Sequence, residues 1–213
     1  MRCRKEGRRM KYNEWRGISG LVYARLTKDE NTESGLTYGE VKPLSGAQKI
    51  SKKTETSSDT KYYDNIPAIV IEATGPDEVT LTVSVLDNET LADITGQFYD
   101  EKTGMLVEGE RETRYFAIGY IAEKDDGSPM YVWRYKGTFS IPEDEHNTKD
   151  SGTDSTNQEI TYTGINTAFR HKKTGKTAKA INVDVGLGLA NVEGFFDKVT
   201  LIDELKAKED LSL

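Results

Sequence analysis

The stretch Val79-Thr-Leu-Thr-Val-Ser-Val85 alternates strictly between aliphatic and hydroxyl-bearing side chains. Successive side chains of a β-strand point to opposite faces, so the four aliphatic side chains are expected to share one buried face. The Thr and Ser side chains then lie on the opposite face, which is open to water. The stretch therefore predicts a half-buried strand and indicates a β fold.

The same period of two recurs along most of the chain. The β-branched run at 68–74 predicts another strand, and Gly75-Pro76-Asp77 predicts a turn that separates it from residues 79–85. The dipeptide Asp126-Gly127 favours a hairpin, and residues 177–183 are expected to pair with a late strand. The other strands are expected at 18–27, 36–41, 113–122, 130–140 and 159–170.

One short helix is expected at about 87–95. Asp87 or Asn88 can cap its first turn, and Gly96 can end it, because glycine readily adopts the left-handed conformation that closes many helices. With strands almost everywhere else, the fold class is mainly β, a β-sandwich or barrel-like domain with one short α-helix.

The 213 residues are enough for one large β domain, which the pattern places at 17–190. Residues 1–16 carry seven Lys and Arg against two Glu and predict a basic, flexible N-terminal arm. Three apolar side chains recur at helical spacing within 191–213, which predicts a C-terminal helix or arm. The net charge of -7 gives no support to general nucleic-acid binding, and no stretch is apolar enough for a membrane span.

Residues 49–61 contain a single apolar side chain, Ile50, and cannot bury a face. They predict an exposed hairpin or a mobile loop within the domain. In an isolated subunit we expect this segment to be mobile, because little burial offsets the entropy lost on ordering.

Each motif that could carry chemistry lacks a required part. Thr174-Gly-Lys-Thr177 lacks the first Gly of a phosphate-binding loop, and Gly186-Leu-Gly-Leu-Ala-Asn191 lacks the third Gly of a dinucleotide fingerprint. Glu143-Asp-Glu-His146 could attract a hard cation, but its spacing is not that of a calcium loop. Cys3 is the only cysteine, which excludes an intramolecular disulfide and a Cys-based zinc site. We expect no catalytic, cofactor or metal site.

Six aromatic residues could line a surface on which sugars or bases stack. Alternatively, they pack within the sheet as cross-strand pairs, which is the favoured interpretation. These residues are Tyr62, Tyr63, Tyr115, Tyr120, Trp133 and Tyr135.

Several short motifs follow one another along residues 17–200. They are Tyr38-Gly39, Leu44-Ser-Gly-Ala47, Tyr62-Tyr63-Asp64-Asn65, the helix that ends at Gly96, Arg114-Tyr-Phe-Ala117, Ile160-Thr-Tyr-Thr163 and Phe195-Phe196. Their order resembles that of the major tail protein, or tail tube protein, family of bacteriophages with long, non-contractile tails. Arg114 departs from the usual Pro of that family.

The resemblance implies a β-sandwich with a flanking helix that assembles into hexameric rings. Such rings stack into a tube around the tape measure protein, and DNA later passes through the lumen without specific binding. The implied partners are other copies of the chain, the tape measure protein, and the tail terminator and distal tail proteins. The implied location is the virion tail, assembled in the host bacterial cytoplasm, with no membrane association and no cofactor.

Within such a tube, the polar segment at 49–61 is able to reach a neighbouring subunit. The candidate interface residues are Lys49, Lys52, Lys53, Glu55, Asp59, Lys61, Tyr62 and Tyr63. The alternative function is a monomeric β-sandwich that binds a carbohydrate or a receptor through exposed aromatic residues. A hydrolase with a carboxylate pair is a third possibility that no motif supports. The size of the native protein in solution distinguishes the first two.

Overall fold

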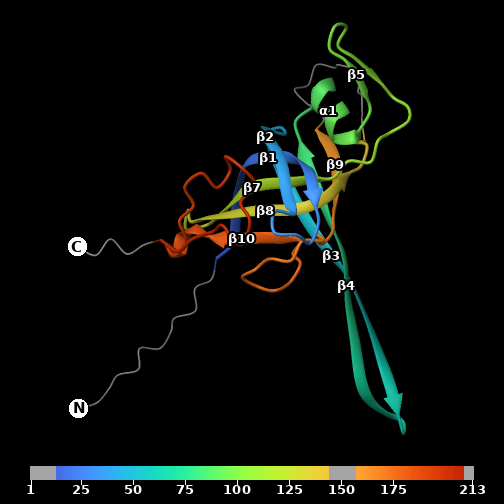
Figure 1. Ribbon diagram of the computed structural model, residues 1–213, viewed down its shortest axis with the longest axis vertical. Helices are drawn as coiled ribbons and strands as arrows, with labels where there is room; N and C mark the ends of the chain where they lie inside the picture. The colour runs from blue at the N-terminus through green and yellow to red at the C-terminus, as the bar shows by residue number, and fades with distance from the viewer. Residues whose placement is uncertain (1–12, 144–156, 209–213) are drawn as a thin grey trace, which may run out of the picture.

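An antiparallel sheet of eight strands forms most of the structure (Figure 1). The computed structural model describes residues 13–143 and 157–208. The strand order is β2-β1-β7-β8-β9-β4-β3, and β10 also pairs with β8. The strands are β1 (Trp15–Asp29), β2 (Leu36–Pro43), β3 (Ala47–Tyr63), β4 (Ile66–Val83), β7 (Phe116–Lys124), β8 (Pro129–Phe139), β9 (Gln158–Gly164) and β10 (Ala180–Asp184).

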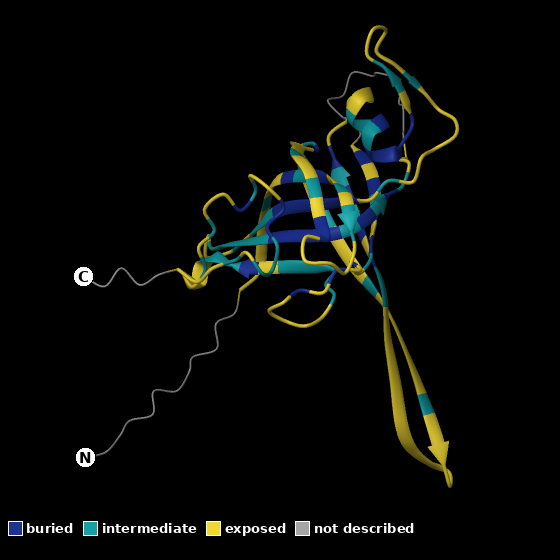
Figure 2. Cartoon of the chain, in the orientation of Figure 1, coloured by how far each residue is buried: buried dark blue, intermediate teal, exposed yellow. Residues whose placement is uncertain are grey.

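The two end strands of this order, β2 and β3, do not pair with each other, so the sheet does not close into a barrel. Instead, strands from both halves of the sheet contribute to one core, in which Tyr23 of β1, Leu81 of β4 and Ile160 of β9 lie together. Figure 2 shows that the buried stretches of the strands gather in the body of the molecule. This arrangement agrees with the mainly β class and with the sandwich that the period of two predicts.

The strand predicted at 79–85 is confirmed as the last part of β4, with its aliphatic face in the core. Val79, Leu81 and Val83 have no exposed surface, whereas Thr80 and Thr82 are half-buried. Val85 was predicted to share the buried face, and that prediction is wrong. The strand ends at Val83, and Val85 is 71% exposed in the following bend.

Replacing Leu81 by Ala is expected to lower the free energy of unfolding by about 2–5 kcal/mol, because the side chain is fully buried and its loss leaves a cavity. Thr82→Ala is the matched control one residue away on the other face, and it should cost far less. Chemical denaturation of the two variants gives the comparison. Equal losses would contradict the assignment of the two faces.

The short helix is confirmed as α1 (Asn88–Thr95), and it begins and ends as predicted. The Asp87 carboxylate accepts a hydrogen bond of 2.7 Å from the Thr90 backbone N–H, and Gly96 follows the helix with φ of 71°. A Cβ at Gly96 would lie 2.0 Å from the Glu112 carbonyl oxygen, so only glycine fits. A two-stranded ribbon of β5 (Phe98–Asp100) and β6 (Met105–Val107) lies beside the helix.

The β3–β4 pair is one long hairpin, which decides between two alternatives at 49–61 and corrects the turn predicted at 75–77. Residues 49–61 are part of β3, so the hairpin alternative holds and the loop alternative does not. The chain reverses at Asp64 and Asn65, whose positive φ values of 51° and 63° these side chains tolerate. The turn predicted at Gly75-Pro76-Asp77 is wrong: Gly75 and Pro76 lie within β4 as an unpaired bulge, a position that accommodates proline in a sheet.

The hairpin predicted at Asp126-Gly127 is confirmed, and it joins β7 to β8. The partner strand predicted for residues 177–183 is wrong. Residues 180–184 form β10 and pair with Met130–Arg134 of β8 instead. β9 offers little free edge, because β4 pairs with it along its whole length and β8 pairs with its last residues.

The C-terminal segment covers the outer face of β7 and β8, and its described residues form turns rather than a helix. The indole N–H of Trp133 donates to the Phe195 carbonyl at 3.0 Å, and the Tyr135 hydroxyl donates to the Thr200 carbonyl at 3.1 Å. Gly194, with φ of 66°, interrupts the backbone where the helix was expected. Of the two forms predicted for the C-terminal segment, a helix or an arm, the second therefore fits its described residues. η1 (Val185–Leu187) is a single 3₁₀ turn that precedes it.

Buried His171 gives this region a pH-dependent stability. The ring lies 5.6 Å from the ring of Tyr135 and 5.2 Å from that of Phe169, and burial lowers its pKa although the nearby Asp203 carboxylate acts to raise it. The unfolded chain therefore takes up a proton at a higher pH than the folded chain, and stability is lost as the pH falls below about 6.5.

We expect thermal unfolding of the protein to move to lower temperature between about pH 7.5 and 5.5, because the free energy of unfolding falls by at most about 1.4 kcal/mol for each step of one pH unit. In His171→Phe the contribution of the histidine to this pH dependence should disappear. A plot of unfolding temperature against pH should then be flatter between about pH 7.5 and 5.5. An identical pH dependence in both proteins would show that His171 does not titrate differently on folding.

Candidate assembly surfaces

The distal part of the β3–β4 hairpin projects from the body as an arm (Figure 1). We define the arm as residues 55–76, because β9 pairs with β4 only from Asp77 onward. Beyond that residue the two strands pair only with each other. A two-stranded ribbon without a third strand or a covering layer has little stability of its own in water. Its two faces are available for contact with another chain.

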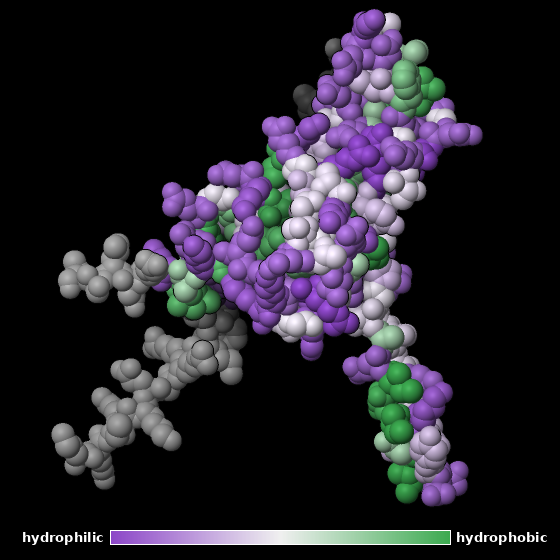
Figure 3. Space-filling model, viewed as in Figure 1, coloured by the Kyte–Doolittle hydropathy of each residue, from purple (hydrophilic) through white to green (hydrophobic). Residues whose placement is uncertain are grey.

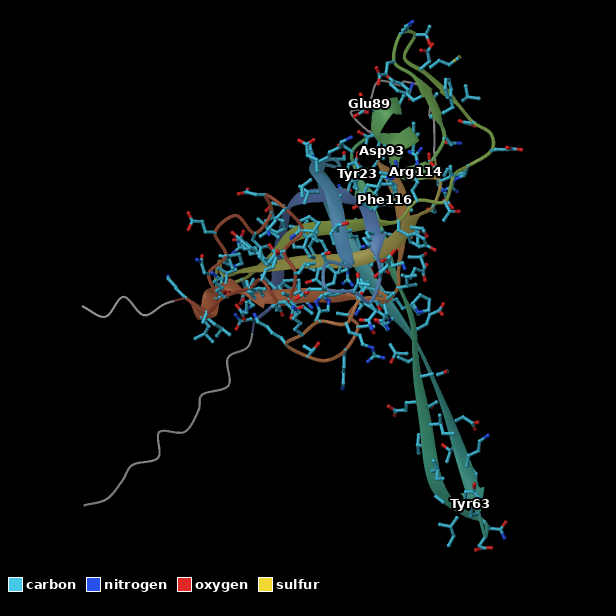
Figure 4. All side chains as sticks on the ribbon, in the orientation of Figure 1. Tyr23, Tyr63, Glu89, Asp93, Arg114 and Phe116 are labelled. Atoms are coloured by element: carbon cyan, nitrogen blue, oxygen red, sulfur yellow. The ribbon has the colours of Figure 1, made fainter. Side chains whose placement is uncertain are left out.

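The arm exposes an unusual amount of apolar surface (Figure 3). Isolated exposed apolar side chains are normal, but a contiguous set on a protruding element marks an interaction site. The two tyrosines next to the turn are 64% and 61% exposed, and Figure 4 labels Tyr63 at the tip. The exposed aromatic and aliphatic residues of the arm are Tyr62, Tyr63, Ile66, Ile69, Val70 and Ile71.

The eight predicted interface residues divide between the arm and the body. Lys49, Lys52 and Lys53 precede the arm on β3, and the first two line a cleft in the body. The others lie on the arm itself, where Lys61 pairs with Asp59 at 2.5 Å. The residues on the arm are Glu55, Asp59, Lys61, Tyr62 and Tyr63.

The aliphatic half of the arm, on β4, was missed by the sequence reasoning. The run at 68–74 has apolar side chains on both faces, which is typical of a strand buried on both sides. The structure exposes Ile69, Val70 and Ile71 instead. One signal could have located them: this run pairs with the polar segment 49–61. A strand buried on both sides would not pair with so polar a neighbour.

A buried carboxylate holds the root of the arm to the body. Asp77 is 5% exposed and forms an ion pair of 3.0 Å with Arg134 of β8. The same carboxylate accepts a hydrogen bond of 2.9 Å from Thr54 of β3 and lies 3.3 Å from the ammonium group of Lys179. Lys52 is a fourth partner at 4.0 Å. One side chain thus joins both arm strands to β8 and to the segment before β10.

These contacts favour the ionised form of Asp77. Burial alone would raise its pKa, but hydrogen bonds from Thr54 and Lys179 and the charges of Lys52 and Lys179 together hold the pKa below its ordinary value. The carboxylate is therefore charged at neutral pH.

The aromatic residues considered as a stacking surface separate into two groups. Tyr120, Trp133 and Tyr135 are buried in the sheet, as the packing interpretation expects. Tyr115 is 37% exposed, and only the two tyrosines of the arm tip are widely exposed. No single aromatic platform is therefore present among the described residues.

Within 13–143 and 157–208, no group of three or more His, Cys, Asp and Glu side chains is arranged to hold a metal ion. Of the acidic cluster at 143–146, only Glu143 belongs to the described residues, and its backbone forms a bridge with Glu159. The described helices include none that is long and apolar enough to cross a membrane. Gly175, in the glycine-lysine motif, occupies a turn with φ of 65°.

The fold and the projecting arm define a mainly β protein with an exposed apolar surface suited to association. The sequence profile of a family described as phage tail tube protein matches residues 49–200, which is more than half of the chain and includes the arm. The chain belongs to this family. It is accordingly a structural component of the virion tail. A search of curated proteins found no match.

Proposed function

We propose that the chain assembles with itself into hexameric rings, and that the rings stack into the tail tube through which DNA leaves the virion. Membership of the tail tube family supports this proposal, and the arm is the observation that carries it. Its exposed apolar side chains have no cover within the subunit, so a second copy that covers them stabilises the assembly through the hydrophobic effect.

The other parts of the proposal follow from the family. The tube would surround the tape measure protein and end at the tail terminator and distal tail proteins, and it would be built in the host bacterial cytoplasm. Six copies of a chain of net charge -7 would form a strongly acidic ring. Such a ring repels phosphate groups, which favours passage of DNA over binding. The proposed role includes no catalysis.

Light scattering of the purified protein over a range of concentrations, followed by electron microscopy, tests this function. Rings or tubes are the expected result, either spontaneously or after a trigger. A protein that stays monomeric at every concentration, yet gains thermal stability with a glycan, would instead support the carbohydrate-binding alternative. The burial of Tyr120, Trp133 and Tyr135 counts against that alternative, because it removes half of the aromatic residues it requires.

A further inference from the structure

A cleft with a volume of about 790 Å³ lies where the start of β3 faces β1, β7 and β8. Its floor is formed by apolar side chains of the sheet, among them Ile18 and Val132. Its charged lining residues are all cationic: they are Arg16, Lys49, Lys52 and Arg134, and no Asp or Glu is among the described residues that line it. We call this feature the basic cleft.

The described residues balance the positive charge of the basic cleft only in part. Arg16 and Lys49 form no ion pair with any residue in the described part of the chain. Lys52 and Arg134 do have a partner, but it is the single carboxylate of Asp77, which Lys179 also shares. A cationic cleft in a protein of net charge -7 is suited to an acidic partner.

The same chain carries an acidic feature of matching character outside the cleft. Residues 87–113, which comprise α1 and the β5–β6 ribbon, hold eight Asp and Glu against two Lys and Arg, a net charge of -6. We call this segment the acidic lobe. Glu101, Glu108 and Glu110 are exposed and form no ion pair with a described residue.

The ribbon of the acidic lobe also exposes apolar side chains. Phe98, Met105 and Val107 are 63%, 50% and 42% exposed, and the hydrophobic colouring in Figure 3 extends to this end of the molecule. The lobe thus combines an apolar strip with unpaired glutamates. The cleft combines an apolar floor with a cationic rim, so the two features are complementary in both polarity and charge.

The lobe is firmly joined to the body through contacts outside the cleft. Asp93 of α1 accepts a hydrogen bond of 3.0 Å from the Tyr23 hydroxyl and lies 3.5 Å from the Arg114 guanidinium (Figure 4). Arg111 donates to the carbonyl of Phe139 at 3.0 Å, at the last residue of β8. The cleft instead involves Met130 and Val132, near the start of β8. Extended strand rises by about 3.3 Å per residue, which separates Met130 from Phe139 by roughly 30 Å. The β3 side of the cleft lies nearer to the lobe, because Lys49 pairs with Thr82, close to the start of the lobe.

We propose that the acidic lobe of one copy docks into the basic cleft of the next copy. Because lobe and cleft are different surfaces of the chain, the contact is head-to-tail. A head-to-tail contact leaves a free lobe at one end and a free cleft at the other, so it extends into a stack or closes into a ring. This inference rests on the proposed self-assembly and names a contact for it that is separate from the arm.

The test compares two charge-reversed proteins with their combination. Arg16→Glu with Lys49→Glu reverses the cleft rim, and Glu108→Lys with Glu110→Lys reverses the lobe. Neither pair of residues has an ion-pair partner in the described subunit, so thermal unfolding of the monomers should be nearly unchanged. We expect either double variant to raise the critical concentration for assembly about tenfold or more, because attraction becomes repulsion at two positions. The protein with all four changes should recover assembly.

The matched control is Lys176→Glu with Lys206→Glu, which makes the same change in net charge at exposed positions outside the cleft. It should assemble as the unaltered protein does. Two results overturn the lobe–cleft contact alone. In the first, the cleft variant assembles at the same critical concentration as the unaltered protein. In the second, the variant with all four changes does not recover assembly. Failure of the unaltered chain to assemble overturns the proposed function and this contact with it.

A nucleic acid is the competing occupant of a cationic cleft. Binding of a short oligonucleotide at about 0.15 M salt is measured for the unaltered protein and for the cleft variant. No binding by either protein is expected, because the acidic body repels phosphates. Binding that the cleft variant loses, together with unaffected assembly, would assign the cleft to nucleic acid and overturn the proposal.

Discussion

Shortening the arm is expected to abolish tube assembly while the subunit stays folded. Deleting 57–62 together with 67–73 joins the pair Thr56–Thr74 to the pair Tyr63–Ile66 and retains the turn at Asp64-Asn65. The deleted residues pair only with each other and contact no core, so we expect a loss of at most about 1 kcal/mol in the free energy of unfolding. Electron microscopy and chemical denaturation measure the two effects.

A full-length variant separates the role of the apolar surface from the role of arm length. Ile69→Ser with Ile71→Ser removes two exposed aliphatic side chains and should weaken assembly strongly. Ser57→Ala with Ser58→Ala, on the paired strand, is the control and should have little effect. Normal tubes from the shortened protein would show that the arm is not an assembly element.

Removing the carboxylate at the root of the arm is expected to be strongly destabilising. Asp77→Ala leaves the buried Arg134 guanidinium without its ion-pair partner, which costs about 3–5 kcal/mol in comparable buried pairs. Asp59→Ala is the matched control, because the Asp59–Lys61 pair is exposed and such pairs contribute about 0–1 kcal/mol. Chemical denaturation at neutral pH gives both values.

The pH dependence of Asp77 has a defined sign. Its pKa in the folded chain is below the ordinary value of about 4, so its contribution is complete above that pH and is lost as the pH falls through the folded pKa. Asp77→Ala should therefore show a shallower loss of stability in acid than the unaltered protein. The double variant Asp77→Ala with Arg134→Met should be less destabilised than the two single changes added together. Simple additivity would contradict a direct coupling of these two residues.

Local patterns in the sequence determined the parts of the fold that depend on neighbouring residues. The alternation at 79–83, the capped helix between Asp87 and Gly96, and the hairpin at Asp126-Gly127 were all predicted and confirmed. Each depends on a period or on a turn residue within about ten positions, and here the tertiary contacts agree with the local signal. The order of the short motifs likewise led to the tail tube family.

Only the tertiary structure decided which faces are buried and which strands pair. The run at 68–74 has the pattern of a buried strand, but it projects beyond the end of β9 and finds no cover. Gly75-Pro76 has the composition of a turn, but pairing on both sides holds it as a bulge. The Phe195 segment has helical spacing, but the body competes for its backbone through Trp133. In each case a partner distant in the sequence decided the outcome, because pairing and burial depend on what lies across the sheet and not on the local pattern alone.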